Sequence, residues 1–386
     1  MLLDHFCYSL KKFSPKDTPL SLYIHLPWCE KQCPYCDFNI DTNKRDGEEE
    51  SLVEAILTDL DASKKYILDR KFISVYFGGG TPSLVKSKNI EKILLKLLNN
   101  QMLENDCEIS FEFNPKEVSL DYVTDLSNMG VNRASIGIQS FDEDTLKSLE
   151  RNHNAHDALK ALDIIAGVSS IKTSIDLIYG VMNQTPLSLE KDINIFCSQN
   201  ISHLSMYQLT IEPNTIFYKK ELKIPKDTEI EAMELIATNL LNKSGFYQYE
   251  VSSWAKDHSF SRHNINYWMY GDFLGLGPGA HSKITTESSI KRMIKLKKVG
   301  SYIKNPSKVG EQEISSNSYD IDLAMNLLRL KNGVSFDELR KRKIYLSETF
   351  RKKLQDGIEN NLLEKNGIKA TDIGYKFLND TVNIFS

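Results

Sequence analysis

Residues 22–39 read LYIHLPWCEKQCPYCDFN and carry the most specific pattern in this chain of 386 residues. An apolar run typical of a β-strand, 22–26, is followed at once by Cys29, Cys33 and Cys36. Three thiolates at this spacing can hold one small inorganic cluster, and an iron-sulfur cluster with three cysteine ligands keeps one iron open for a reactant. A zinc site completed by His25, or buried thiols without a function, are the alternatives.

The sequence beyond this loop alternates between strand-like and helix-like segments. The apolar, β-branched runs are 22–26, 73–77, 109–113, 134–138, 173–178 and 204–209. The helical patterns between them are 52–66, 89–98, 120–129, 158–166 and 187–199. This order predicts right-handed βαβ units in a parallel sheet. Six units fit an open doubly wound sheet or an incomplete barrel, and both place ligand sites at the carboxyl ends of strands.

The composition is typical of a soluble globular protein. Forty-eight basic and 52 acidic residues give a net charge of -4, which argues against a surface built mainly for nucleic acid or anionic membranes. No apolar stretch reaches the roughly 18 residues of a membrane span, and the start MLLDHFCYSLKK does not resemble a signal peptide. Six cysteines with a tight trio favour metal binding over a disulfide framework. We expect a cytoplasmic protein.

A glycine-rich segment, Gly78 to Gly80 with Thr81 and Pro82, ends the second predicted strand. A CxxxCxxC loop after the first strand and GGGTP after the second resemble the radical S-adenosylmethionine superfamily. The resemblance implies an α/β fold, a partial (β/α)6 radical-SAM barrel with a small C-terminal helical or winged domain. It also implies that the cysteine trio holds a [4Fe-4S] cluster, whose open iron would chelate the amino and carboxylate groups of S-adenosylmethionine.

Polar residues at successive strand ends extend this predicted site. Glu112 ends the third strand, Gln139 follows the fourth, Asp176 lies near the end of the fifth, and Arg151 lies in a helical segment, LERNH. The glycines allow close backbone approach and offer N–H groups to the methionine moiety. Any one of these residues could instead be a cap, a turn or a satisfied core group. The predicted S-adenosylmethionine site comprises Tyr23, Tyr35, Gly79, Gly80, Thr81, Glu112, Gln139, Arg151 and Asp176.

Within the superfamily, the chain is similar to the coproporphyrinogen III dehydrogenase-like group over nearly its whole length, as FGGGTPS, FEFNP, RASIGIQSF, LERNH, SIDLIYG and YQLTIEPNT indicate. The oxygen-independent dehydrogenases carry a further cysteine two residues after the third, where this chain has Phe38. CDFN at 36–39 and HNINYW at 263–268 are instead similar to the HemW-type heme chaperones. This branch implies heme as cargo and delivery to acceptor proteins, with oxidative decarboxylation of a porphyrinogen as the alternative.

The heme candidates are His263, Tyr267 and Trp268, because imidazole ligates iron and the aromatic rings offer stacking area. The same segment could instead close a loop over the barrel mouth, with its Tyr and Trp in the core. His281, in PGAHS, is a further candidate ligand. His25 lies in the strand before the cysteines and is expected to pack beside the cluster.

We divide the chain into an N-terminal segment (1–18), a barrel core (19–245), an extension and connector with the HNxxYW segment (246–318) and a winged-helix-like C-terminal domain (319–386). Residues 247–253 are predicted to form a strand, and the Lys-, Ser-, Thr- and Asn-rich residues 283–318 are typical of a loop. The C-terminal part ends in a predicted two-stranded wing. Its residues 320–386 hold twelve basic and ten acidic side chains, so we expect no nucleic-acid binding. The expected partners are heme and heme-accepting proteins, including membrane-associated respiratory proteins, and the resemblance allows a homodimer.

Overall fold

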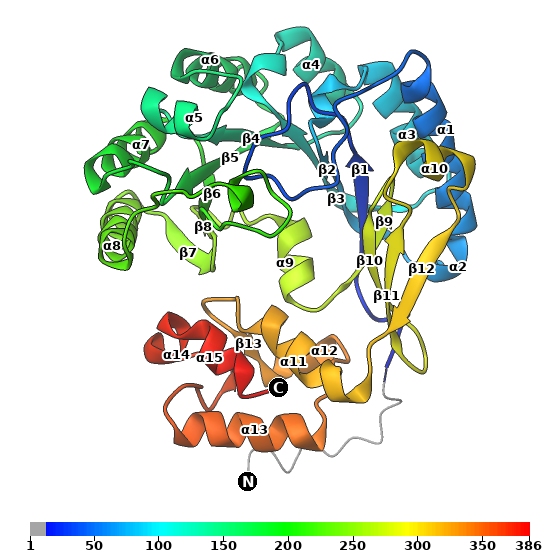
Figure 1. Cartoon of the computed structure of the whole chain (residues 1–386). Helices are drawn as coiled ribbons and strands as arrows, with labels where there is room; N and C mark the ends of the chain where they lie inside the picture. Colours follow the sequence, from blue (N-terminus) through cyan, green and yellow to red (C-terminus); the bar gives the residue numbers. More distant parts are fainter. Residues whose placement is uncertain (1–12) are drawn as a thin grey trace.

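Six parallel strands form the centre of one large open sheet in the computed structural model, which describes residues 13–386 (Figure 1). The first twelve residues of the predicted N-terminal segment lie outside the described part. The strands follow one another in sequence order across the sheet. A doubly wound sheet needs a reversal of strand order, so the incomplete barrel is confirmed. The six strands are β1 (Leu20–Leu26), β2 (Phe72–Gly79), β3 (Leu103–Phe113), β4 (Arg133–Gln139), β5 (Lys172–Tyr179) and β6 (His203–Gln208).

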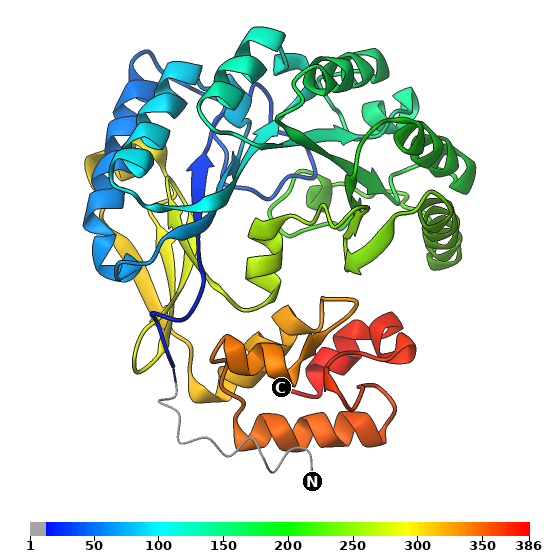
Figure 2. The same cartoon turned by 180° about the vertical axis from the view of Figure 1, so that it is seen from behind.

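Helices cover the convex side of this sheet, as the view from behind shows (Figure 2). Their apolar faces and the outer side chains of the strands form one continuous core, in which Val75, Ile136 and Leu204 are fully buried. Local sequence sets the helix starts: Asn154 caps α6 through a capping box, and Thr185 with Pro186 begins α7. The helices are α1 (Glu48–Ala62), α2 (Lys64–Ile67), α3 (Ser87–Asn99), α4 (Leu120–Asn128), α5 (Glu143–Ser148), α6 (Ala155–Ala166), α7 (Pro186–Ser198) and α8 (Asp227–Lys243).

Further strands extend both edges of the barrel sheet. On one side, β9 (Asp272–Leu276) pairs in parallel with β1, and β10 (His281–Thr285), β11 (Ile290–Lys295) and β12 (Val309–Glu313) follow as antiparallel strands. The helix α10 (Val299–Lys304) precedes β12. The loop prediction for 283–318 was therefore wrong. Lys283 is buried in β10 and forms an ion pair with Asp272. The composition of 283–318 does not reveal such a pair, so its lysines suggested an exposed loop.

At the opposite edge, residues 247–253 were predicted as one strand and instead begin a hairpin. β7 (Tyr247–Glu250) and β8 (Ser253–Ala255) pair with each other, and β8 pairs with β6. The HNxxYW segment forms the helix α9 (Arg262–Trp268) rather than a loop. This helix contacts β1, β2 and β9 on the concave side of the sheet (Figure 1).

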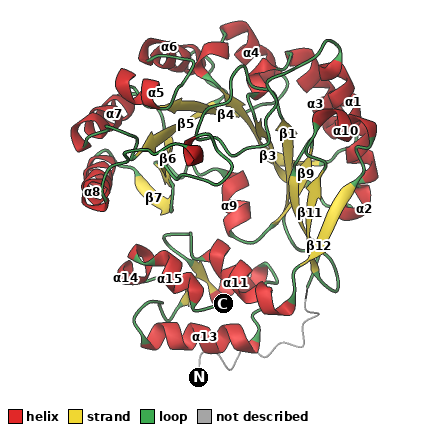
Figure 3. Ribbon diagram, in the orientation of Figure 1, coloured by secondary structure: helices red, strands yellow, loops and turns green. Residues whose placement is uncertain are grey.

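The C-terminal module lies below the barrel (Figure 3). It has its own apolar core, which α9 joins through Trp268. The predicted wing is only partly present: one bridge joins Leu363 and Ala370, and 372–383 are mostly helical. None of the helices in residues 13–386 is both long and apolar enough to cross a membrane. The elements of the module are α11 (Ser316–Leu327), β13 (Val334–Ser335), α12 (Phe336–Lys341), α13 (Glu348–Glu359), β14 (Gly367–Ile368), α14 (Asp372–Lys376) and α15 (Leu378–Asn383).

Candidate cofactor site

The cysteine loop leaves the carboxyl end of β1 and is closed at its base by backbone hydrogen bonds. The N–H of Cys29 donates to the Asp41 carbonyl at 3.1 Å, and the N–H of Asp41 donates to the Pro27 carbonyl at 2.8 Å. The Trp28 side chain, next to these hydrogen bonds in the chain, is buried. The loop is therefore anchored in the core, while its three cysteines stay half-buried.

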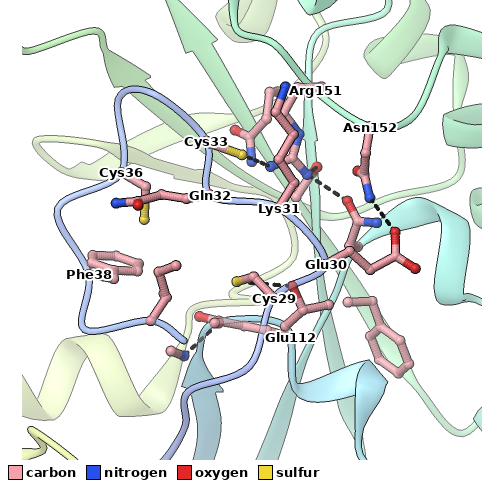
Figure 4. Close-up of a pocket in the computed structure, with 18 of the residues that line it drawn as sticks. Cys29, Glu30, Lys31, Gln32, Cys33, Cys36, Phe38, Glu112, Arg151 and Asn152 are labelled. Carbon is pink, nitrogen blue, oxygen red and sulfur yellow. Dashed lines mark hydrogen bonds between the residues drawn. The ribbon is translucent and has the colours of Figure 1, made fainter. Parts of the chain in front are cut away.

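These cysteines line one open cavity at the carboxyl ends of the barrel strands (Figure 4). Its empty volume, mouth included, is about 970 Å³. The cavity walls come from the ends of β1 to β5, which is where the barrel rule places ligand sites. All of the predicted S-adenosylmethionine residues except Tyr23 line it: Tyr35, Gly79, Gly80, Thr81, Glu112, Gln139, Arg151 and Asp176.

The donor set of this cavity suits an iron-sulfur cluster better than a single metal ion. Among residues 13–386, no three His, Cys, Asp or Glu side chains lie close enough together to hold one ion. In a cluster each thiolate binds a different iron, so the ligands stand further apart. Three thiols that face one cavity from three points of a loop fit such a group. Burial raises the pKa of the Cys36 thiol to about 11, and iron coordination would deprotonate it.

The glycine segment packs against the start of the cysteine loop. The N–H of Gly80 donates to the Leu26 carbonyl at 2.8 Å, and that of Thr81 to the Trp28 carbonyl at 2.7 Å. The N–H of Gly79 donates to Glu112 Oε2 at 3.1 Å. The sequence predicts that these N–H groups face the methionine moiety, but all three bind acceptors of the protein itself. In this structure the N–H groups of Gly80 and Thr81 position the start of the cysteine loop, and that of Gly79 binds Glu112.

Gly80 provides a direct test of this packing. A β-carbon on Gly80 would lie 2.6 Å from the carbonyl oxygens of both Pro27 and Trp28, which is too close for any side chain. We expect Gly80→Ala to lower the free energy of unfolding by about 1–3 kcal/mol, as overpacking does elsewhere. Gly300→Ala, in α10, is the control, because a β-carbon there would meet no described atom within 4 Å apart from its chain neighbours and the backbone of its own helix. Urea unfolding of both variants measures the loss. Equal unfolding free energies for the two variants would show that the cysteine loop can shift to make room for the added methyl group.

Arg151 joins the cysteine loop to the far wall of the cavity. Its Nη1 lies 3.3 Å from both Cys33 Sγ and the Tyr35 hydroxyl, and its Nη2 donates to Asn114 Oδ1 at 2.7 Å. Nη2 also donates to the Gly137 carbonyl at 3.0 Å. Arg151 lies in the turn between α5 and α6, so the prediction that it is helical was wrong. Its guanidinium brings a fixed positive charge to the thiol of Cys33.

Two half-buried carboxyl groups, those of Glu112 and Asp176, line the cavity. Glu112 accepts hydrogen bonds from the Tyr76 hydroxyl at 2.8 Å and from Gly79, and Asp176 accepts from Ser135 at 3.3 Å. Burial, together with the charge of Asp176, raises the pKa of Glu112 to about 7. Burial likewise raises the pKa of Asp176 to about 6. A cationic ligand would reverse both shifts, because it stabilises the carboxylates.

Tyr23 lies outside the cavity and supports it from below. Its hydroxyl donates to Nδ1 of the buried His25 at 3.0 Å, and His25 Nε2 donates to the Asn39 carbonyl at 2.7 Å. Both ring nitrogens are thus engaged, so His25 does not complete a zinc site. The Asn39 amide in turn donates to the carbonyls of Pro278 at 2.9 Å and Lys297 at 2.8 Å. These bonds tie the end of the cysteine loop to the turn between β9 and β10.

Asn39 and Asn114 are site residues to which the sequence patterns assigned no role. Both belong to segments quoted above, CDFN and FEFNP, so a signal was present. Asn39 binds the Pro278 carbonyl 239 positions away and Asn114 binds Arg151 37 positions away, and no local pattern reveals such contacts.

A second cavity continues from the first, and Phe38 lines both. The Phe38 side chain is 61% exposed, so it stands at the shared mouth as an apolar surface. The second cavity also reaches Tyr76 and Tyr207 and has an empty volume of about 1100 Å³. The two cavities share Tyr35, Phe38, Glu112, Ser135, Gln139 and Asp176.

The HNxxYW residues His263, Tyr267 and Trp268 lie outside both cavities and pack α9 between the barrel and the C-terminal module. His263 is buried, with Nδ1 at 3.0 Å from Ser74 Oγ. Tyr267 stacks on Phe273 with 4.0 Å between ring centroids. The guanidinium of Arg329 lies 4.2 Å from the centre of the Trp268 ring. These contacts match the alternative in which the Tyr and Trp belong to the core.

Comparison with known proteins agrees with this architecture. The model of the radical SAM superfamily matches residues 23–194. The heme chaperone HemW of Escherichia coli K12 is 34% identical over 370 residues, which cover 95% of this chain and 98% of that protein. The heme chaperone HemW of Buchnera aphidicola from Schizaphis graminum is 35% identical over 371 residues, with 95% and 98% coverage. The chain belongs to the HemW family.

The fold of this HemW family member also occurs in a solved structure. Coproporphyrinogen III oxidase (HemN) of Escherichia coli, a radical SAM enzyme, superposes with a TM-score of 0.79 at 20% identity. The match covers 97% of this chain and 91% of that enzyme. At this identity the likeness establishes the shared fold, a radical SAM barrel with a C-terminal domain. It does not transfer the enzyme's reaction.

Proposed function

We propose that this protein is a heme chaperone that binds a [4Fe-4S] cluster and S-adenosylmethionine and delivers heme to acceptor proteins. The carrying observation is the similarity to heme chaperones over 95% of the chain. A partial match to the barrel alone would support only the superfamily. The similarity to heme chaperones is 34–35% over nearly the whole chain, against 20% for the enzyme HemN, so it supports the chaperone rather than the dehydrogenase.

Cys29, Cys33 and Cys36 would hold the cluster, which when bound supplies an open iron site and redox chemistry. Arg151 would keep its positive charge beside the anionic cluster, since its Nη1 lies 3.3 Å from Cys33 Sγ. Its buried Nε has no hydrogen-bond partner among the described residues, and a bound group would offer an acceptor. The donor types and their shared cavity support this assignment.

The neighbouring carboxyl groups would bind S-adenosylmethionine. Glu112 and Asp176 would accept hydrogen bonds from its ammonium group or its ribose hydroxyls. Their burial makes ionisation costly in the empty cavity, so a cationic ligand gains more from them than it would at the surface. Gly79 and Gly80 leave room for close approach, since neither carries a side chain.

Phe38 argues against the dehydrogenase alternative. The resemblance assigns a further cysteine to this position in the decarboxylating branch, and Phe38 supplies neither a thiol nor a proton. Its exposed ring at the cavity mouth instead offers apolar area. The fold likeness to HemN is compatible with either activity, so the reaction has to be tested directly.

The test uses protein reconstituted anaerobically with iron and sulfide. One sample is titrated with hemin, and another is incubated with coproporphyrinogen III, S-adenosylmethionine and a reductant. We expect stoichiometric hemin binding, followed by transfer of heme to an apo-cytochrome, and no protoporphyrinogen. Formation of the decarboxylated product would identify the protein as a dehydrogenase. Absence of hemin binding would reject the chaperone.

A further inference from the structure

A histidine that ligates a transferable heme has to be accessible to a large planar ligand. Residues 13–386 contain seven histidines, and their surroundings differ sharply. Four are buried in the core, and three are exposed. The buried ones are His25, His153, His203 and His263, and the exposed ones are His156, His258 and His281.

His263 is the least accessible of the predicted heme residues. Its ring lies 5.0 Å from the ring of Tyr76, and its Nδ1 is bonded to Ser74. Ser74 also donates to Ser21 at 2.8 Å, and Asn266 donates to the same Ser21 oxygen at 2.9 Å. An iron atom could reach this imidazole only after α9 had moved off β1 and β2.

Two of the exposed histidines lie away from the cysteine loop. His156 is in the first turn of α6, in the outer layer of helices. His258 contacts Tyr247 and Phe260 beside the β7–β8 hairpin, at the other edge of the sheet. None of the three exposed histidines lines the cofactor cavity, so their positions relative to the cysteine loop distinguish them.

His281 lies at the same end of the barrel as the cysteines. It opens β10 directly after the turn 277–280, which Asn39 of the cysteine loop binds through the Pro278 carbonyl at 2.9 Å. Its partner across β11 is Ile294, an apolar neighbour. An exposed imidazole next to an apolar side chain offers an iron ligand together with an apolar contact for the porphyrin.

The charges of two cationic side chains, Lys297 and Arg292, act on His281, and heme carries two propionates. Lys297, just beyond β11, is exposed. It lines an open groove with Arg45, Lys298 and Lys304, where Asp41 and Glu48 are the opposing carboxyl groups. Burial, followed by the charges of Lys297 and Arg292, lowers the pKa of His281. The imidazole is thus neutral and able to ligate iron near pH 7.

We propose that His281 is the axial ligand of the transferred heme and that Lys297 binds a propionate. This inference rests on the proposed chaperone function and gives that function a binding surface. Heme would lie on the exposed face near the cysteine loop, not in the core around α9. Such a position suits handover, because a partner can approach the iron without unfolding the barrel.

The test is a hemin titration of full-length, cluster-loaded protein followed by the Soret band. We expect His281→Ala to lose the spectrum of imidazole-ligated heme and to bind hemin at least about tenfold more weakly. Mutating a residue that only orients a metal ligand already lowers metal affinity by that factor. Added imidazole should restore the spectrum. His258→Ala is the matched control for an exposed histidine, and His263→Gln, which can still hydrogen-bond Ser74, should retain both spectrum and affinity.

Lys297→Glu separates the propionate contact from the iron ligand. We expect it to weaken binding of hemin but not of hemin dimethyl ester, with the spectrum unchanged. If wild-type protein binds no hemin, the chaperone function itself fails. If hemin binds and His281→Ala leaves spectrum and affinity unchanged, the function stands and this inference is overturned. Loss of ligation in His263→Gln alone would return the ligand to the HNxxYW segment.

Discussion

Replacing Cys29, Cys33 or Cys36 with serine, one at a time, is expected to abolish the brown colour of anaerobically reconstituted protein. All three cysteines line one cavity, and no fourth thiol of residues 13–386 lines it to substitute for a lost one. A serine hydroxyl stays protonated near neutral pH and is a poor ligand for cluster iron. The measurement is iron and sulfide content together with the absorbance of the cluster, which should fall to background in each variant.

Cys197→Ser is the control, because Cys197 is a half-buried thiol of α7, remote from the cavity. It should keep the full cluster. Circular dichroism should show that all four variants are folded, since the cluster cysteines are not part of the apolar core. Full iron and sulfide in every one of the three loop variants would remove the cluster from the proposed function.

The largest loss of stability is expected from Asp272→Ala. This buried carboxylate accepts from Arg70 at 2.8 Å, from Lys283 at 3.3 Å and from the Thr285 hydroxyl at 2.7 Å. The side chains of Arg70 and Lys283 are only 7% and 2% exposed. Removing the carboxylate leaves two buried cations without a counter-charge, which costs about 3–5 kcal/mol for a single pair. Urea unfolding measures the loss.

Asp372→Ala removes a matched aspartate from an exposed ion pair. Asp372 lies 3.5 Å from Lys331 and is fully exposed, so we expect a change of at most about 1 kcal/mol. Asp272→Asn keeps the shape of the side chain and should fall between the two alanine variants. Equal unfolding free energies for Asp272→Ala and Asp372→Ala would show that water or other polar groups stabilise the buried cations when the carboxylate is removed.

The barrel strands were predictable because their residues are buried on both faces. Such strands appear as short apolar runs, and turn residues end them. The extension strands lack this pattern: Lys283 and Lys295 are buried only because Asp272 and Asp59 neutralise them from distant parts of the chain. A window of neighbouring residues holds no information about such a pairing, so β10 and β11 were predicted as loop.

The candidate site divides in the same way. The cysteines, Thr81 and Glu112 were recognisable from local spacing and from their places at strand ends. The support of His25 by Tyr23, and the hold of Asn39 on the β9–β10 turn, depend on contacts between segments. Residues with distinctive chemistry can be recognised from the sequence. The residues that position them can be recognised only once their contact partners are known.

The sequence alone determined the family, the parallel barrel and the cysteine cavity, because each rests on residue types at short, regular spacings. Only the tertiary structure decided which histidine is accessible. The sequence favours His263 in the HNxxYW segment over His281 in PGAHS, yet α9 packs the first against Ser74, while β10 leaves the second exposed beside the cysteine loop. Exposure depends on which elements cover a side chain, and that follows from the packing of segments remote in the chain.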